Sequence, residues 1–248
     1  MSTESAAFQA DLRVDEAPYP VSELVYLTLA VTFVTLLVLT NLIGVKLFQA
    51  PHDPAHFALT TGILTYPLTF LCTDLVSELY GQRRADAMVV LGFFMSALMV
   101  VVVRTAVAVP PHAYWVPAVG AYYPDAQGYQ HAFESVFSLQ GLLLFGSMLA
   151  YMVAQLTDNR LYHFWKRYTG GRHLWLRNNG STMVSQLLDT AIVNSILFYL
   201  GMHMDLWVGL RIMGTIYAYK LVIAALDTPF MYLGVALLRP LTAPQEPA

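Results

Sequence analysis

Charged residues are scarce in this chain, and their scarcity excludes most soluble folds. Asp, Glu, Lys and Arg together make up 12% of the 248 residues, whereas hydrophobic residues make up 57%. A soluble domain carries about 25% charged residues. The net charge is −3, and the thirteen Lys and Arg residues form no stripe that would favour nucleic acid. The sequence therefore predicts an integral membrane protein that binds the lipid bilayer and no nucleic acid.

Cysteine is almost absent, which removes two further classes of site. The one cysteine, Cys72, lies within an apolar run, so we predict neither a disulfide framework nor a thiolate metal site. The seven histidines are scattered along the chain, and imidazoles this far apart rarely form one site. We therefore expect no cofactor and no metal ligands. A carrier for a metal cation stays open as an alternative, because His52 and His56 flank Asp53.

Long apolar runs take the place of charge. Six of them approach the ~20 residues that a helix needs to cross a bilayer. Together they predict an all-α integral membrane protein, a bundle of six transmembrane helices. The predicted spans are Leu24–Leu47, Ala58–Tyr80, Ala85–Val109, Ser138–Asn159, Ser181–Leu200 and Arg211–Leu238. The membrane domain then covers residues 24–238, between short tails at 1–23 and 239–248.

Basic residues are missing from every second loop between these spans. Residues 49–57, 110–135 and 201–210 contain no Lys or Arg, whereas nine of the thirteen basic residues lie in the other loops and the two tails. Basic loops stay in the cytoplasm under the positive-inside rule. The sequence therefore predicts that both termini are cytoplasmic, as an even number of spans requires.

Two carboxylates interrupt one apolar run, YPLTFLCTDLVSELYG. Asp74 and Glu78 are four residues apart and so share one face of a helix. An ionisable group that faces lipid costs a few kcal/mol, which predicts that this face points into the bundle. Asp74 would lie about 10 Å from the cytoplasmic end of the span at the helical rise, with Glu78 one turn closer to that end. The alternative is that Asp74 pairs with a basic residue and only holds two helices together.

A second polar pattern occurs twice, in AQLTD and in SQLLD. Each copy places Gln and Asp three residues apart on one helix face, as Gln155 with Asp158 and as Gln186 with Asp189. Asp158 falls near the cytoplasmic end of its span, where an ion pair with Arg160 at the surface would explain it. Asp189 falls about 15 Å into its span, close to the middle of the bilayer. The second copy therefore lies deeper than the first.

The last span supplies the opposite charge. Lys220 falls near mid-depth, and Asp227 follows seven residues later on the same face. Pro229 removes a helical N–H, which predicts a kink beside Asp227. Helices interrupted beside intramembrane polar groups are typical of transporter sites. A buried pair between Lys220 and Asp189 or Asp74 that only fixes packing stays open as the alternative.

Most of these polar residues fall in five segments: TNLIGVKLF, YPLTFLCTDLVSELYG, AQLTDNRLYHFWKR, WLRNNGSTMVSQLLDT and YKLVIAALDTPFMYLG. In this order the segments resemble those of the queuosine precursor transporters, within the vitamin uptake transporter family. The third predicted span and residues 110–135 have no matching segment. The resemblance implies a bacterial inner-membrane importer of 7-cyano-7-deazaguanine and 7-aminomethyl-7-deazaguanine, precursors of the tRNA base queuosine. Whether it works as a monomer or as a homodimer, and what drives transport, stays open.

The chemistry of a 7-deazaguanine suits the polar residues inside the predicted spans. Its N1–H and 2-amino group are adjacent donors that one carboxylate can accept, while O6 needs a donor such as Gln, Asn or Lys. Aromatic walls suit its flat faces, and Tyr66, Phe70, Tyr219 and Phe230 are candidates. The aminomethyl form is cationic, so a spare carboxylate would favour it. The predicted substrate-binding residues are Asn41, Asp74, Glu78, Gln155, Asp158, Gln186, Asp189, Asn194, Lys220 and Asp227.

An intramembrane enzyme is the remaining alternative. The sequence contains no Gly-x-Ser-Gly elbow, no His-Glu-x-x-His motif and no paired-aspartate protease motif. We therefore expect no catalytic residue. Uptake of a metal cation that a deazaguanine does not inhibit would favour the cation carrier over the deazaguanine importer.

Overall fold

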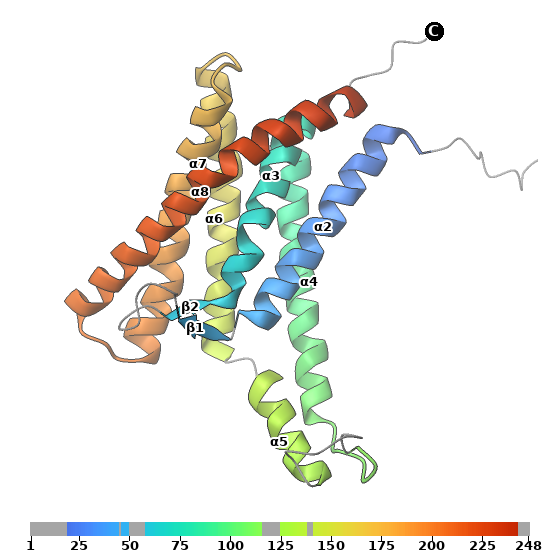
Figure 1. The fold of residues 1–248 in the computed structure, drawn as a ribbon, viewed down its shortest axis with the longest axis vertical. Helices are drawn as coiled ribbons and strands as arrows, with labels where there is room; N and C mark the ends of the chain where they lie inside the picture. The colour runs from blue at the N-terminus through green and yellow to red at the C-terminus, as the bar shows by residue number, and fades with distance from the viewer. Residues whose placement is uncertain (1–18, 45, 50–57, 116–124, 138–140, 243–248) are drawn as a thin grey trace, which may run out of the picture.

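The computed structural model describes residues 19–44, 46–49, 58–115, 125–137 and 141–242. Within these ranges α-helices form most of the chain, and α5 lies beyond one end of the helix bundle (Figure 1). The seven described α-helices are α2 (Val21–Ile43), α3 (Tyr66–Tyr80), α4 (Gln82–Ala108), α5 (Ala126–Phe137), α6 (Gly141–Tyr168), α7 (Leu174–Ser195) and α8 (Leu206–Thr242). A short π-helical segment, η2 (Ile196–Gly201), continues α7.

Four of the described helices are long and apolar enough to cross a membrane. They are α2, α4, α7 together with η2, and α8. By contrast, α3 has 15 residues, about 22 Å at the helical rise, which is less than the ~30 Å of a bilayer core. α6, with 28 residues, is long enough to cross a bilayer but is not among these four helices. The helical membrane architecture is confirmed, while the count of six spans stays a prediction.

The second predicted span becomes α-helical later than its apolar run suggests. Ala58–Thr60 forms a strand, β2, that pairs antiparallel with β1 (Leu47–Gln49), and Thr61–Leu64 forms a 3-10 turn, η1. α3 begins only at Tyr66, with Pro67 in its first turn, where proline is well tolerated. Thr61 and Gly62, which open η1, are poor helix formers, so the predicted helix start was wrong. α2 likewise ends before β1.

A helix, α5, falls mostly within residues 110–135, which the sequence assigned to a loop between two spans. The ring of Trp115 packs on it, with centroids 4.9 Å from Tyr129 and 5.5 Å from Phe133. Gln130 of α5 donates a hydrogen bond to the carbonyl of Val107, near the end of α4, at 2.9 Å. These contacts hold α5 against the end of α4. Hydropathy did not predict it because the helix is short and mixed in polarity.

The two ends of the described chain lie at the same end of the molecule. The start of α2 and the end of α8 lie near the turn between α6 and α7, while α5 lies at the opposite end (Figure 1). α8 is one α-helix from Leu206 to Thr242 and includes Pro229. α8 is therefore not broken beside Asp227, and the kink expected there stays a prediction.

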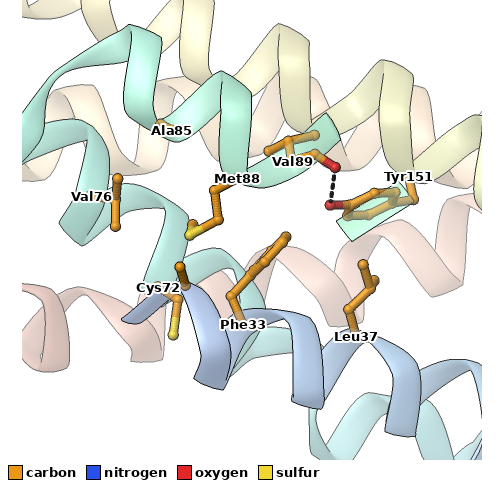
Figure 2. Close-up of a cluster of buried hydrophobic side chains, with 9 residues drawn as sticks. Phe33, Leu37, Cys72, Val76, Ala85, Met88, Val89 and Tyr151 are labelled. Atoms are coloured by element: carbon orange, nitrogen blue, oxygen red, sulfur yellow. Dashed lines mark hydrogen bonds between the residues drawn. The ribbon is translucent and has the colours of Figure 1, made fainter. Parts of the chain in front are cut away.

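An apolar core holds α2, α3, α4 and α6 together (Figure 2). The hydroxyl of Tyr151 donates to the carbonyl of Val89 at 3.1 Å, across α6 and α4. Gly92 permits the close approach, because a Cβ there would lie 2.8 Å from Phe33 and 2.9 Å from Leu37. The buried members of this core are Ala30, Phe33, Leu37, Cys72, Val76, Ala85, Met88, Val89 and Tyr151.

The polarity of α7 is reversed relative to a surface helix of a soluble protein. Trp175, Met183, Val184 and Leu187 are exposed on it. A helix with an apolar outer face and a polar inner face suits lipid outside and a polar site inside. Its buried residues, all of them polar, are Arg177, Asn178, Ser181, Thr182, Ser185, Gln186, Asp189, Thr190 and Asn194. The core that α7 faces therefore holds most of the buried polar side chains that could form a site.

Candidate functional site

Buried polar side chains fill the space between α3, α6 and α7. We call this set the polar core. It consists of Thr73, Asp74, Gln155, Asp158, Ser185, Gln186 and Asp189, all of them buried. The two Gln–Asp pairs of the sequence lie on α6 and α7, which pack directly against each other. The structure therefore brings five of the predicted site residues into one region.

Asp74 and Asp158 face each other across α3 and α6. Their carboxyl groups lie within hydrogen-bonding reach of one another, and the two residues are 1% and 0% exposed. Ser185 of α7 donates its hydroxyl to Oδ1 of Asp158 at 2.7 Å. The predicted surface pair of Asp158 with Arg160 is wrong, because Arg160 is exposed and residues two apart on a helix point about 200° apart.

Several polar atoms of this region have no hydrogen-bond partner among the described residues. Thr73 donates to Oε1 of Gln155 at 3.3 Å, which leaves Nε2 of Gln155 unpaired. The Tyr66 hydroxyl, Oε1 of Gln186 and Oγ1 of Thr190 are also buried and unpaired. An unpaired buried donor or acceptor costs about 1–3 kcal/mol. Unpaired donors and acceptors gathered in one place are what a polar ligand would satisfy.

Lys220 and Asp189 join α8 to α7 beside these atoms. The Lys220 ammonium lies 2.5 Å from Oδ2 of Asp189 and 5.1 Å from the centroid of the Tyr66 ring. The Tyr66 hydroxyl faces Asp189 and Gln186, and its ring packs on Phe70 with centroids 5.0 Å apart. This group combines a carboxylate, a cation and two aromatic rings, as recognition of a flat polar ligand requires.

Glu78 lies at the other end of α3, in a cluster of charges from four helices. Its Oε1 accepts from Arg177 of α7 at 2.7 Å and from Arg239 of α8 at 2.8 Å. Its Oε2 accepts from Lys166 of α6 at 2.9 Å and from the hydroxyl of Tyr162 at 3.1 Å. We call these five residues the Glu78 cluster. The Glu78 side chain is 3% exposed, so the cluster closes this end of the polar core.

The remaining predicted residues take other positions. Asn41 of α2 donates to the hydroxyl of Ser96 on α4 at 3.2 Å, and neither residue belongs to the polar core. Asn194 donates to the carbonyl of Thr190 on its own helix at 2.8 Å. Asp227 is partly buried on α8 and close enough to Asp74 for their charges to interact. Whether Asn41, Asn194 and Asp227 contribute to a common site stays a prediction.

Metal ligation has little support in the described part of the chain. No group of three or more His, Cys, Asp or Glu side chains there could hold a metal ion. His131 lies near Glu134, at 3.5 Å, on the same turn of α5. His52 and His56, which kept the cation carrier open, lie outside the described residues.

Comparison with known proteins supplies the context for this geometry. Residues 60–234 match the model of a family described as "Putative vitamin uptake transporter". The chain belongs to this family. Over 175 residues it is 31% identical to a protein of Bacillus subtilis (strain 168) named "Probable queuosine precursor transporter", and the match covers 70% of each chain. No solved structure matches the chain.

The match to the vitamin uptake transporter family covers most of the candidate site. It runs from the end of β2 into α8 and includes the polar core, Lys220, Asp227 and Glu78. Asn41 lies before the matched segment. The resemblance found in the sequence is therefore confirmed at the level of the family. A family of transporters with several apolar helices indicates a multi-pass membrane protein.

Sequence reasoning missed the partners that these residues find on other helices. Arg177, Lys166 and Arg239 were counted only as cytoplasmic charge, yet all three contact Glu78. Asn159, fully buried beside Asp158, donates to Asp86 of α4 at 2.9 Å. The polar face of α7 was the available signal for Arg177. Arg177 lies four residues before Ser181, so the two share one face of the helix, and both are buried.

Proposed function

We propose that this vitamin uptake transporter imports 7-cyano-7-deazaguanine and 7-aminomethyl-7-deazaguanine across the bacterial inner membrane. The unpaired polar atoms of the polar core carry the proposal. Buried donors and acceptors without partners are costly, and a deazaguanine offers the complementary groups. The name of the Bacillus subtilis relative points to the same substrate class.

Each edge of the substrate finds a counterpart near Asp189. Its N1–H and 2-amino group suit a carboxylate that accepts two hydrogen bonds, and Asp189 is held in place by Lys220 at 2.5 Å. O6 suits a donor such as the unpaired Nε2 of Gln155. The ring faces suit Tyr66 and Phe70. Asp74 and Asp158 then lie between this site and the cytoplasmic end, on the exit path.

The same proposal includes six spans with both termini in the cytoplasm. The start of α2, the end of α8 and the Glu78 cluster lie at one end of the molecule (Figure 1). The basic residues of this cluster suit the cytoplasmic side. In this topology α3 crosses the bilayer together with η1 and the β1–β2 hairpin. Protein must then cover η1 and the hairpin, because irregular backbone is tolerated at membrane depth only where it is covered.

Uptake in cells that cannot make queuosine precursors tests the proposal directly. We expect the queuosine content of tRNA to rise when either precursor is supplied and this protein is expressed. Asp189→Asn removes the charge but keeps the shape and should abolish the rise. Asp205→Asn is the matched control, because Asp205 is exposed and only caps α8 through the N–H of Trp207 at 2.9 Å. Normal uptake by Asp189→Asn at normal expression would contradict the assigned site.

A further inference from the structure

Two buried carboxyl groups, those of Asp74 and Asp158, face each other, and the binding of a deazaguanine does not explain why. We propose that the two carboxyl groups together bind one proton, and that this proton enters the cell with each substrate molecule. The protein would then be a proton-coupled symporter. The inference rests on the proposed function and adds its driving force.

A hydrogen atom between the two side chains would satisfy the oxygens that their surroundings leave without a donor. Oδ1 of Asp74 and Oδ2 of Asp158 are buried and have no donor among the described residues. The second oxygen of Asp158, Oδ1, is already satisfied by Ser185 at 2.7 Å. Two ionised carboxylates in contact repel each other strongly where water is excluded. One shared proton removes this repulsion and supplies the missing donor.

No cation in the described part of the chain neutralises the pair. On α8, Asp227 adds a further negative charge close to Asp74. The hydroxyl groups of Ser181, Thr182 and Ser185 face Asp158 from α7 and are neutral. The other charged side chains nearby already have partners. Glu78 pairs with Arg177, Lys166 and Arg239, and Asp189 pairs with Lys220. Asp86 accepts a hydrogen bond from the amide of Asn159.

The position of the pair connects the substrate site to the cytoplasmic end. Gln155, with its unpaired Nε2, lies three residues before Asp158 on the same face of α6. Glu78 lies one turn after Asp74 on α3, at the closed end of the polar core. A ligand that binds at Gln155 therefore acts on the helix that carries Asp158. Separation of α3 from α6 would part the two carboxyl groups and remove the reason for sharing a proton.

The proton balance of one cycle is simple. One proton from the outer solution joins the pair while substrate is bound, and it leaves to the cytoplasm when the pair separates and the substrate departs. Only O–H bonds to carboxylate and to water are formed and broken. Coupling follows if the outward-open and inward-open states differ in proton affinity. A proton held permanently for packing would not exchange in this way.

Proteoliposomes that contain the full chain and a pH-sensitive dye inside test the coupling. The substrate is 7-cyano-7-deazaguanine, which is neutral, so any acid that enters with it is the coupled proton. We expect acidification of the interior when substrate is added outside. An outside pH lower by one unit should support accumulation of about tenfold, because one proton per substrate balances a tenfold concentration ratio.

Asp158→Asn provides the variant arm, because an amide cannot bind the proton. We expect it to lose both acidification and accumulation, while Asp205→Asn keeps both. Uptake by the parent protein without acidification and regardless of the pH gradient, or accumulation driven only by sodium, would overturn the coupling and leave the proposed function intact. Absence of any deazaguanine uptake by the parent protein would overturn the proposed function, and the coupling with it. The parent measurements decide the question even if Asp158→Asn fails to fold.

Discussion

The Lys220 ammonium on α8 and the Asp189 carboxylate on α7 form an ion pair of 2.5 Å inside the helix bundle. Lys220 also lies over the ring of Tyr66, 5.1 Å from its centroid, so three helices meet at one charge. Such a pair can serve packing alone or can hold a ligand group in place. The two roles predict different results when the pair is removed as a whole.

Breaking this pair should separate stability from transport. Asp189→Asn or Lys220→Met alone leaves one polar partner buried without its match and should cost about 3–5 kcal/mol of folding free energy. The double variant Asp189→Leu with Lys220→Met leaves no charge and should recover most of that loss. All three variants should lose deazaguanine uptake. Thermal unfolding in detergent and uptake in liposomes measure the two effects. Normal transport by the double variant would assign the pair to packing.

The proposed topology predicts opposite labelling of two exposed positions. Cys72 is the one cysteine of the chain, so a Cys72→Ala background carries no thiol. A membrane-impermeant thiol reagent applied outside intact cells should label Asp125→Cys and should reach Arg172→Cys only after the membrane is opened. Both side chains are exposed in the structure, so accessibility is decided by the membrane. Labelling of position 172 but not of position 125 from outside would reverse the topology.

Hydropathy and spacing predicted much of the helical architecture but misplaced some boundaries. α2, α4, α7 and α8 carry apolar faces long enough to be found by a window of about 20 residues. α5 escaped because it has 12 residues and mixed polarity. The start of α3 was misplaced because hydropathy does not distinguish an apolar strand and turn from a helix. Pro229 did not interrupt α8, since one proline can be accommodated inside a long helix.

The candidate site was predictable within each helix and not between helices. Spacing alone places Gln186 and Asp189 on one face of α7, and the structure has both buried. The same reasoning cannot tell which face of α6 meets which face of α3, so the contact of Asp74 with Asp158 was not predicted. Proximity in sequence misled for Asp158, whose neighbour Arg160 points away from it. Contacts across helices depend on packing that no local pattern encodes.

Gly92 predicts a steric effect that is independent of function. Gly92→Ala places a Cβ 2.8 Å from Phe33 and 2.9 Å from both Leu37 and Tyr151, so the core between α2, α4 and α6 must shift. Overpacking of this kind costs about 1–3 kcal/mol. Gly214→Ala on α8 is the matched control, because no heavy atom lies within 4 Å of its Cβ. Thermal unfolding should show a lower midpoint for Gly92→Ala and an equal or higher one for Gly214→Ala. Equal midpoints for both variants would contradict the close packing.

The Glu78 cluster predicts a large loss of stability from a small change. Glu78→Gln keeps the shape of the side chain but leaves Arg177, Lys166 and Arg239 without their common carboxylate. Arg177 is 3% exposed, and a buried charge without a partner costs about 3–5 kcal/mol.

The matched control is Glu23→Gln, which removes an ion pair of similar length. Glu23 binds Arg84 at 2.8 Å, and their side chains are 39% and 41% exposed, so its loss should cost about 1 kcal/mol or less. Thermal unfolding in detergent should therefore show a much larger drop for Glu78→Gln than for Glu23→Gln. High salt should change the drop in unfolding midpoint only slightly for either variant. For Glu78→Gln the reason is that salt screens the buried cluster weakly, and for Glu23→Gln it is that the exposed pair contributes little. If the two variants unfold at the same temperature, Glu78 does not hold α3, α6, α7 and α8 together at this end of the bundle.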